Sequence, residues 1–214
     1  MPTILTAGDA VSAASSFAGA NDGALNIVVG PAGGKLTALT IDAAGKVALP
    51  QGSGGGFLTL GTVQASTSGT SIDFTGIPSW VKRVTMAFSA VGITSAGVGA
   101  CIQLGTASSI ETTGYSGGEA TATGGTSAQN SSAFVIKTNM ATGSTLSGFI
   151  TLVLMDASTN TWAQSGVTAL GNTTQTSLSA GSKSLAGTLT RLRLTTVSGT
   201  DVFAAGKVNI LYEG

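Results

Sequence analysis

The sequence predicts an all-β protein whose main domain is an antiparallel, jelly-roll-like β-sandwich. Apolar residues make up 42% of the 214-residue chain, yet they occur in short runs rather than in long segments. Clusters of Gly, Ser, Thr and Asn separate these runs, as turns separate strands. Several runs alternate between apolar and polar residues, and helical periodicity is nearly absent. A chain of this length can bury a sizeable apolar core.

The clearest strand runs from Arg83 to Ala90. Every second residue from Val84 onward is apolar, so one face of the strand should be buried and the other should face water. The same period of two recurs in residues 191–194 and 207–212. We therefore expect two further strands that line the core.

The run FITLVLM, from Phe149 to Met155, is apolar at both odd and even positions. A strand with two apolar faces is typical of a position between two layers. We expect this strand to be the most buried segment, covered on both sides by a second sheet or by a neighbouring subunit.

Further apolar runs bring the predicted total to about eight strands, a number that suits a β-sandwich. These runs span residues 57–65, 71–74, 100–104, 132–138 and 161–167. Only 8% of the residues are charged, so the sheet edges lack the Lys residues that usually prevent strands of different molecules from pairing. Loops or other chains should cover these edges, which indicates an oligomer.

Residues 1–51 differ from the rest and predict a separate attachment or shaft segment. Brief strands are expected at ALNIVVG, LTALTID and KVALP. The element LTIDAAGKVAL predicts a tight hairpin, with Asp42 at the first turn position and Gly45 at the fourth. The glycine run at residues 52–56 has the composition of a flexible linker, which places the β-sandwich domain at residues 57–214.

Charge and hydropathy exclude several kinds of partner. Nine basic and nine acidic residues give a net charge of zero, which argues against nucleic-acid binding and against an anionic membrane surface. No apolar run approaches the ~20 residues that cross a bilayer. The start of the chain lacks a secretion signal, so we expect synthesis in the cytosol without export by that route. The single cysteine, Cys101, lies in an apolar run and should be a packed thiol without a redox role.

The residue types also argue against an enzyme. The chain has no histidine, which excludes Ser-His-Asp and Cys-His triads and histidine metal ligands. No phosphate-binding glycine motif and no EF-hand spacing is present. We therefore expect no catalytic residues, no cofactor and no metal site.

A long connection is the first candidate for a contact surface. Residues 112–131 show little strand signal, and connections longer than ~12–15 residues in a compact domain are usually functional or mobile. The candidate receptor-contact residues in and beside this connection are Glu111, Tyr115, Glu119 and Asn130. Tyr115 is expected to be the exposed aromatic residue.

Two other readings concern aromatic and acidic residues. Trp80 and Trp162 are expected to pack in the core or in an interface rather than stack on sugars. Glu111 and Glu119 flank an aromatic residue, and glycoside cleavage uses a pair of carboxylates. This pair leaves a polysaccharide depolymerase open as the least favoured function.

Three segments carry a resemblance to a known class of proteins: SGTSIDFTGIPSWVKRVTMAFSAV, IQLGTASSIETTGYSG and KVNILYEG. Residues 56–214 thereby resemble the C-terminal domain of bacteriophage tail-fibre-like and other virion proteins. The most specific parts are Ile72–Arg83 and the pieces IQLG and IETTGY. LTIDAAGKVAL is similar to the repeated strand-turn units of trimeric fibre shafts. The resemblance implies a homotrimer attached to the virion and carries over no catalytic residue.

The leading hypothesis is a tail-fibre or receptor-binding subunit. Residues 1–51 would contact other virion proteins, and the sandwich loops would contact a polysaccharide or protein on the bacterial surface. The alternative is a capsid decoration or head-fibre protein that uses residues 1–51 as its anchor on the capsid.

Overall fold

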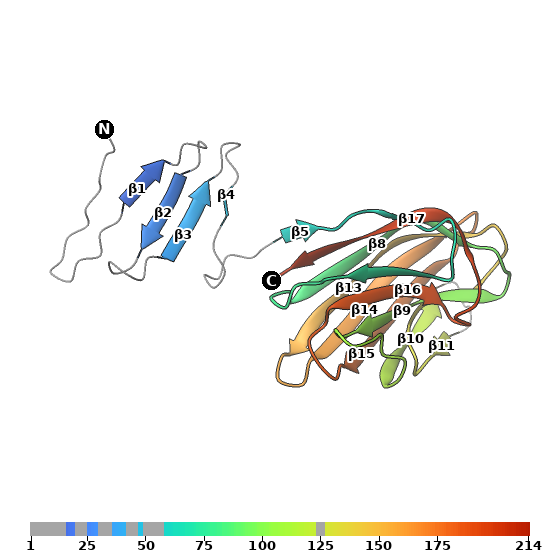
Figure 1. The fold of residues 1–214 in the computed structure, drawn as a ribbon. Coiled ribbons are helices and arrows are strands. Elements are labelled where there is room, and N and C mark those ends of the chain that lie inside the picture. Colours follow the sequence, from blue (N-terminus) through green and yellow to red (C-terminus); the bar gives the residue numbers. More distant parts are fainter. Residues whose placement is uncertain (1–15, 20–24, 30–35, 42–46, 49–57, 123–126) are drawn as a thin grey trace. The chain divides into compact units, whose positions relative to one another are not determined.

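The computed structural model describes residues 16–19, 25–29, 36–41, 47–48, 58–122 and 127–214. The chain divides into two compact units, Met1–Gly56 and Phe57–Gly214. The glycine run at residues 52–56, predicted to be a linker, lies outside the described residues. Within the described part of the chain every regular element is a strand, as the sequence predicts (Figure 1).

The described residues of the first unit form an antiparallel sheet with the strands in chain order. Its strands are β1 (Ser16–Gly19), β2 (Leu25–Val29), β3 (Leu36–Ile41) and β4 (Val47–Ala48). The brief strands predicted in this segment are confirmed. Ile41 lies opposite Val47, so β3 and β4 form the predicted hairpin, whose turn residues Asp42 and Gly45 lie outside the described residues.

The second unit contains two antiparallel sheets (Figure 1). The strands of the larger sheet are β5 (Leu58–Leu60), β6 (Gln64–Ala65), β8 (Arg83–Ile93), β10 (Tyr115–Thr121), β11 (Ser127–Gln129), β13 (Thr145–Asp156), β14 (Thr161–Gly171), β15 (Thr176–Ser184) and β17 (Phe203–Glu213). The smaller sheet consists of β7 (Ser71–Thr75), β9 (Val98–Gly105), β12 (Phe134–Met140) and β16 (Arg191–Thr196). The larger sheet has the order β11-β10-β15-β14-β13-β8-β17-β5, with β6 also beside β17, and the smaller has the order β12-β9-β16-β7.

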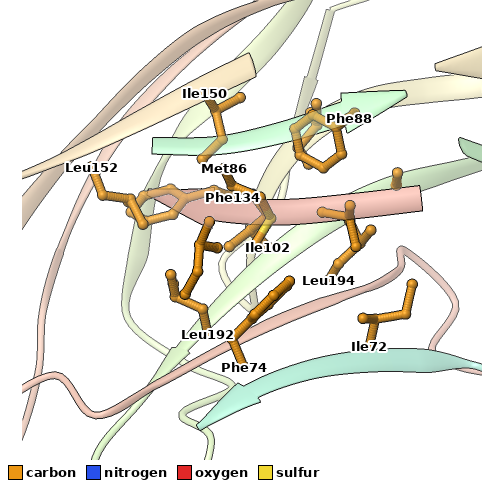
Figure 2. Close-up of a cluster of buried hydrophobic side chains, with 14 of the residues drawn as sticks. Ile72, Phe74, Met86, Phe88, Ile102, Phe134, Ile150, Leu152, Leu192 and Leu194 are labelled. Carbon is orange, nitrogen blue, oxygen red and sulfur yellow. The ribbon is translucent and has the colours of Figure 1, made fainter. Parts of the chain in front are cut away.

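The two sheets share one apolar core, which makes the second unit a β-sandwich. Met86, Phe88 and Ile150 enter the core from the larger sheet (Figure 2). Ile102 and Leu194 meet them from the smaller sheet. The alternation predicted for β8, β16 and β17 is confirmed at most positions, and the buried apolar residues are Val84, Met86, Phe88, Leu192, Leu194, Val208 and Ile210. Ala90, the last apolar position predicted on β8, is exposed instead, because its φ of 54° and a register shift against β13 interrupt the pleat there.

The strand β13 departs from the prediction of two covered faces. Ile150 and Leu152 are fully buried, but Phe149 is 56% exposed and Met155 is 66% exposed. The prediction that Phe149–Met155 is the most buried segment is therefore wrong for the single chain. The reason is that the smaller sheet packs on only one face of β13, and no second layer of this unit covers the other face in the described residues.

The prediction of a long connection without strands at residues 112–131 is also wrong. Residues 115–121 and 127–129 of this segment form the antiparallel strands β10 and β11, in which Glu119 pairs with Ala128. β15, which lies between β10 and β14, was likewise not predicted. These strands have few apolar residues, so backbone pairing rather than apolar alternation defines them.

Glycine is required where β10 and β15 cross the core. Gly181 pairs with Gly117, and a Cβ at Gly181 would collide with the carbonyl oxygen of Ser116. The same Cβ would come within 3.0 Å of the Phe134 ring. The glycines that look like turn residues in the sequence therefore allow these strands to pass beneath an aromatic ring.

The tryptophans and the cysteine lie where they were expected. Trp162 is buried in the core, and Trp80 is half-buried with its ring centroid 5.9 Å from that of Tyr212. Cys101 on β9 is a free, buried thiol.

Burial should make Cys101 unreactive. Desolvation raises the pKa of the Cys101 thiol to about 12, so the thiolate that reacts with alkylating reagents is scarce at pH 8. We expect iodoacetamide at pH 8 to leave the native chain unmodified and to modify one site once guanidinium unfolds it. Mass spectrometry would measure both results, and rapid alkylation of the native chain would contradict the buried position.

Candidate functional site

The four candidate contact residues do not form one surface. Tyr115 is 6% exposed and Glu119 is 2% exposed, so neither can serve as a surface contact. Glu111 and Asn130 are half-buried and lie in different loops. The expectation of an exposed Tyr115 is wrong because β10 turns this side chain into the core, where it packs edge-on against Phe134 at 4.9 Å between ring centroids.

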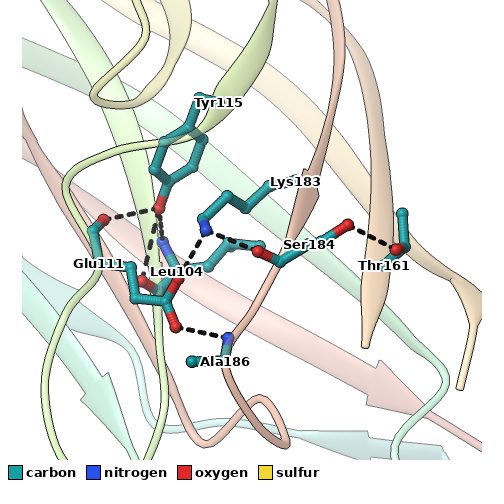
Figure 3. A network of polar contacts seen from close by, with 7 residues as sticks. All are labelled: Leu104, Glu111, Tyr115, Thr161, Lys183, Ser184 and Ala186. Carbon is teal, nitrogen blue, oxygen red and sulfur yellow. Dashed lines mark hydrogen bonds and ion pairs between the residues drawn. The ribbon is translucent and has the colours of Figure 1, made fainter. Parts of the chain in front are cut away.

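Tyr115 and Glu111 belong to one polar network at an end of the sandwich (Figure 3). The Tyr115 hydroxyl accepts a hydrogen bond from the Leu104 amide at 2.7 Å and donates to the Glu111 carbonyl at 2.9 Å. The Glu111 carboxylate lies 2.5 Å from Lys183 Nζ and accepts a hydrogen bond from the Ala186 amide at 2.8 Å. Burial raises the pKa of Tyr115, which keeps this hydroxyl protonated as a donor. The network ties the loop after β9 to the loop after β15.

Glu119 belongs to a second, separate cluster between the sheets. Its carboxylate lies 3.5 Å from Lys137 Nζ and accepts hydrogen bonds from the hydroxyls of Thr121, Thr138 and Ser177. Lys137 also donates to the Thr121 hydroxyl at 2.8 Å. A buried charge needs such partners, and this ion pair is therefore a structural element of the core.

The positions of Glu111 and Glu119 bear on the hypothesis that the chain is a polysaccharide depolymerase. Glu111 and Glu119 each pair with a different lysine and line different parts of the domain. A glycosidase needs both carboxylates to face one bound sugar. Within residues 58–122 and 127–214, these two acids do not form such a pair. The described residues also contain no cluster of three or more Cys, Asp or Glu side chains suited to a metal ion.

A hollow of about 640 Å³ lies beside the Glu111 network, and we call it the loop hollow. Residues 106–113 form one wall, and the loop after β15 forms the other. Seven of the lining residues carry a hydroxyl group: Thr106, Ser108, Ser109, Thr112, Thr113, Thr188 and Thr190.

Both walls of the loop hollow are held in place by the sandwich. Leu185 and Leu189 are buried and anchor the second wall at both ends. The Thr190 amide donates to the Gly105 carbonyl at 3.0 Å, and the Arg191 guanidinium donates to the Ala107 carbonyl at 2.9 Å. The hollow is therefore formed before any ligand arrives, which lowers the entropic cost of binding.

The chemistry of the loop hollow suits a neutral, hydroxyl-rich ligand. Each Ser or Thr hydroxyl can donate and accept hydrogen bonds, as sugar hydroxyls do. The one acidic residue in the lining, Glu111, already pairs with Lys183, so the hollow presents hydroxyls and carbonyls rather than free charge. Of the four candidate residues, Glu111 is the one that lines this hollow, and Tyr115 holds the Glu111 backbone from behind.

Sequence reasoning did not find the second wall. Residues 186–190 lie far from residues 106–113 in the sequence, and no motif marks residues 186–190. The available signal was the pair Leu185 and Leu189 on either side of Ala-Gly-Thr, which indicates a short turn with an apolar anchor at each end. Both leucines are buried in the structure.

Asn130 has a local role. Its side-chain oxygen accepts a hydrogen bond from the Ser132 amide at 2.7 Å, which closes the turn between β11 and β12. It lines a separate hollow of about 240 Å³ with Gln103 and Arg193. Asn130 and the loop hollow are thus different places on the domain.

Two findings complete this description. In the part of the chain that the structure describes, no helix has the length and apolar character needed to cross a membrane. No protein-family model, no curated protein and no solved structure matches the chain.

Proposed function

We propose that this chain is a structural subunit of a bacteriophage virion, namely a tail-fibre or receptor-binding subunit that contacts the bacterial surface through loops of its sandwich. The loop hollow is the observation that carries the proposal. It is preformed, lined by hydroxyls and free of unpaired acidic charge, as a binding site for a neutral surface polysaccharide should be.

The virion part of the proposal rests on the sequence. Ile72–Arg83 and IETTGY resemble tail-fibre-like C-terminal domains, and this resemblance implies a homotrimer on the particle. Residues 1–51 would then contact other virion proteins. IETTGY supplies Glu111 and Tyr115, the two residues that tie the loops around the hollow.

A blocking substitution tests the role of the loop hollow. Thr188 is exposed on its wall, so Thr188→Trp should fill the hollow without disturbing the core. Binding to arrayed bacterial surface polysaccharides should fall by about tenfold or more, equivalent to ~1.4 kcal/mol of binding free energy. The same variant should compete less well with phage adsorption to host cells.

Thr67→Trp is the matched control, since Thr67 is also exposed but lies outside the hollow. This variant should bind as the parent chain does. If the parent chain binds no polysaccharide and does not compete with adsorption, receptor binding through this hollow is wrong. Equal losses in both variants would likewise argue against the site.

A further inference from the structure

The outer face of the larger sheet has an unusual composition. Cross-strand pairs place three rows of outward side chains on the four neighbouring strands β13, β14, β15 and β10, and we call these rows the outer face. None of the twelve positions carries a charge: Phe149, Val167, Leu178, Ala120; Thr151, Ser165, Ala180, Gly118; Val153, Ala163, Ser182, Ser116.

The first row forms an apolar ridge. Phe149 pairs with Val167, and Val167 pairs with Leu178, so the three side chains lie side by side across three strands. They are 56%, 46% and 48% exposed. Contiguous exposed apolar side chains of this size usually mark an interaction surface.

The second row forms a groove beside the ridge. Its four residues, Thr151, Ser165, Ala180 and Gly118, have small side chains. On each strand the groove residue is two positions away from the ridge residue, which separates the two rows by ~7 Å. Residues of both rows line a hollow of about 770 Å³. A ridge and a groove of matching direction therefore lie next to each other on one face.

We infer that the outer face is covered by a second copy of this chain, with the ridge of one copy packed against the groove of the next. A surface that holds both complementary shapes can bind its own copy. The absence of charge supports this occupant, because contact between the ridge of one copy and the groove of the next would bring no like charges together. The inference deepens the proposed function, since a homo-oligomeric subunit needs such an interface.

The size of the face agrees with a stable contact. The four strands that carry the outer face, β13, β14, β15 and β10, are 12, 11, 9 and 7 residues long. At ~4.8 Å spacing and a rise of ~3.4 Å per residue they outline roughly 640 Å². A standard interface buries ~800 Å² on each partner. The contact would also cover the exposed face of β13 that the single chain leaves open.

Site-specific alkylation tests the inference. Val167→Cys places a thiol on the ridge, and Val202→Cys places one outside the face at a parent exposure of 40% against 46% for Val167. The native Cys101 is buried and adds little background. If about nine-tenths of the full-length chain is associated, the Val167→Cys thiol should react about tenfold more slowly than the Val202→Cys thiol.

Two further results are expected from the same samples. Adding Leu178→Glu to the Val167→Cys variant puts a charge in the ridge and should restore fast alkylation, while the circular dichroism spectrum stays unchanged. Equal alkylation rates for the two cysteines at ~100 μM chain would overturn the inference. Polysaccharide binding by the same protein reports the proposed function separately, so each can fail without the other.

Discussion

Replacing Phe88 with alanine should lower the free energy of unfolding by ~3–5 kcal/mol, because truncation of a buried phenylalanine loses apolar burial and leaves a cavity. Phe88 is 5% exposed, and its strand β8 lies between β13 and β17. Its backbone partners are Gly148 and Val208, so its ring enters the core at the centre of the larger sheet. Denaturant titration at fixed chain concentration would measure the change.

Phe88→Leu is the graded control for this prediction. Leucine keeps most of the buried apolar volume, so the loss should be less than half that of Phe88→Ala. A loss below ~1 kcal/mol for Phe88→Ala would contradict the inward orientation of this side chain.

The second large effect is expected at Lys137. Its side chain is 3% exposed, and it is the cation closest to the buried Glu119 carboxylate. Lys137→Met keeps a long apolar side chain but leaves that carboxylate with hydroxyl partners alone. Removing one member of a buried ion pair costs ~3–5 kcal/mol, and we expect a loss of unfolding free energy in this range.

A double variant separates the lost attraction from the stranded charge. Glu119→Gln added to Lys137→Met removes the charge while the amide keeps oxygen and nitrogen atoms for the neighbouring hydroxyls. The double variant should recover more than half of the stability that the single variant loses. No recovery, or a single-variant loss below ~1 kcal/mol, would show that the Glu119 cluster is not a dry ion pair.

The sequence predicted those strands in which one face is apolar and the other polar. In residues 83–88 and 191–194 the alternation alone identifies the buried side chains, because the pleat turns successive residues to opposite faces. It could not distinguish a strand between two layers from a strand with one uncovered apolar face. For β13 both arrangements give the same sequence pattern, and only the number of sheets that pack against the strand distinguishes them.

The polar clusters were beyond sequence reasoning for a different reason. Glu119 lies among Gly, Ala and Thr, and Lys137 directly follows an apolar run, so nothing in the sequence pairs the two residues. Their burial depends on β10 and β12 meeting across the sandwich, which is a property of the tertiary fold. The loop hollow likewise requires two segments about 80 residues apart to meet, as the hydrogen bond from Arg191 to the Ala107 carbonyl illustrates.

The position of β8 between β13 and β17 has a consequence during synthesis. β8 ends at Ile93, β13 begins at Thr145 and β17 begins at Phe203, so each partner strand is translated long after β8. At ~5–20 residues per second, the ribosome needs on the order of 5–20 s to bring β17 to β8. Throughout that interval one edge of an apolar strand stays open on the nascent chain, and the cell's holding chaperones are the natural protection against its aggregation.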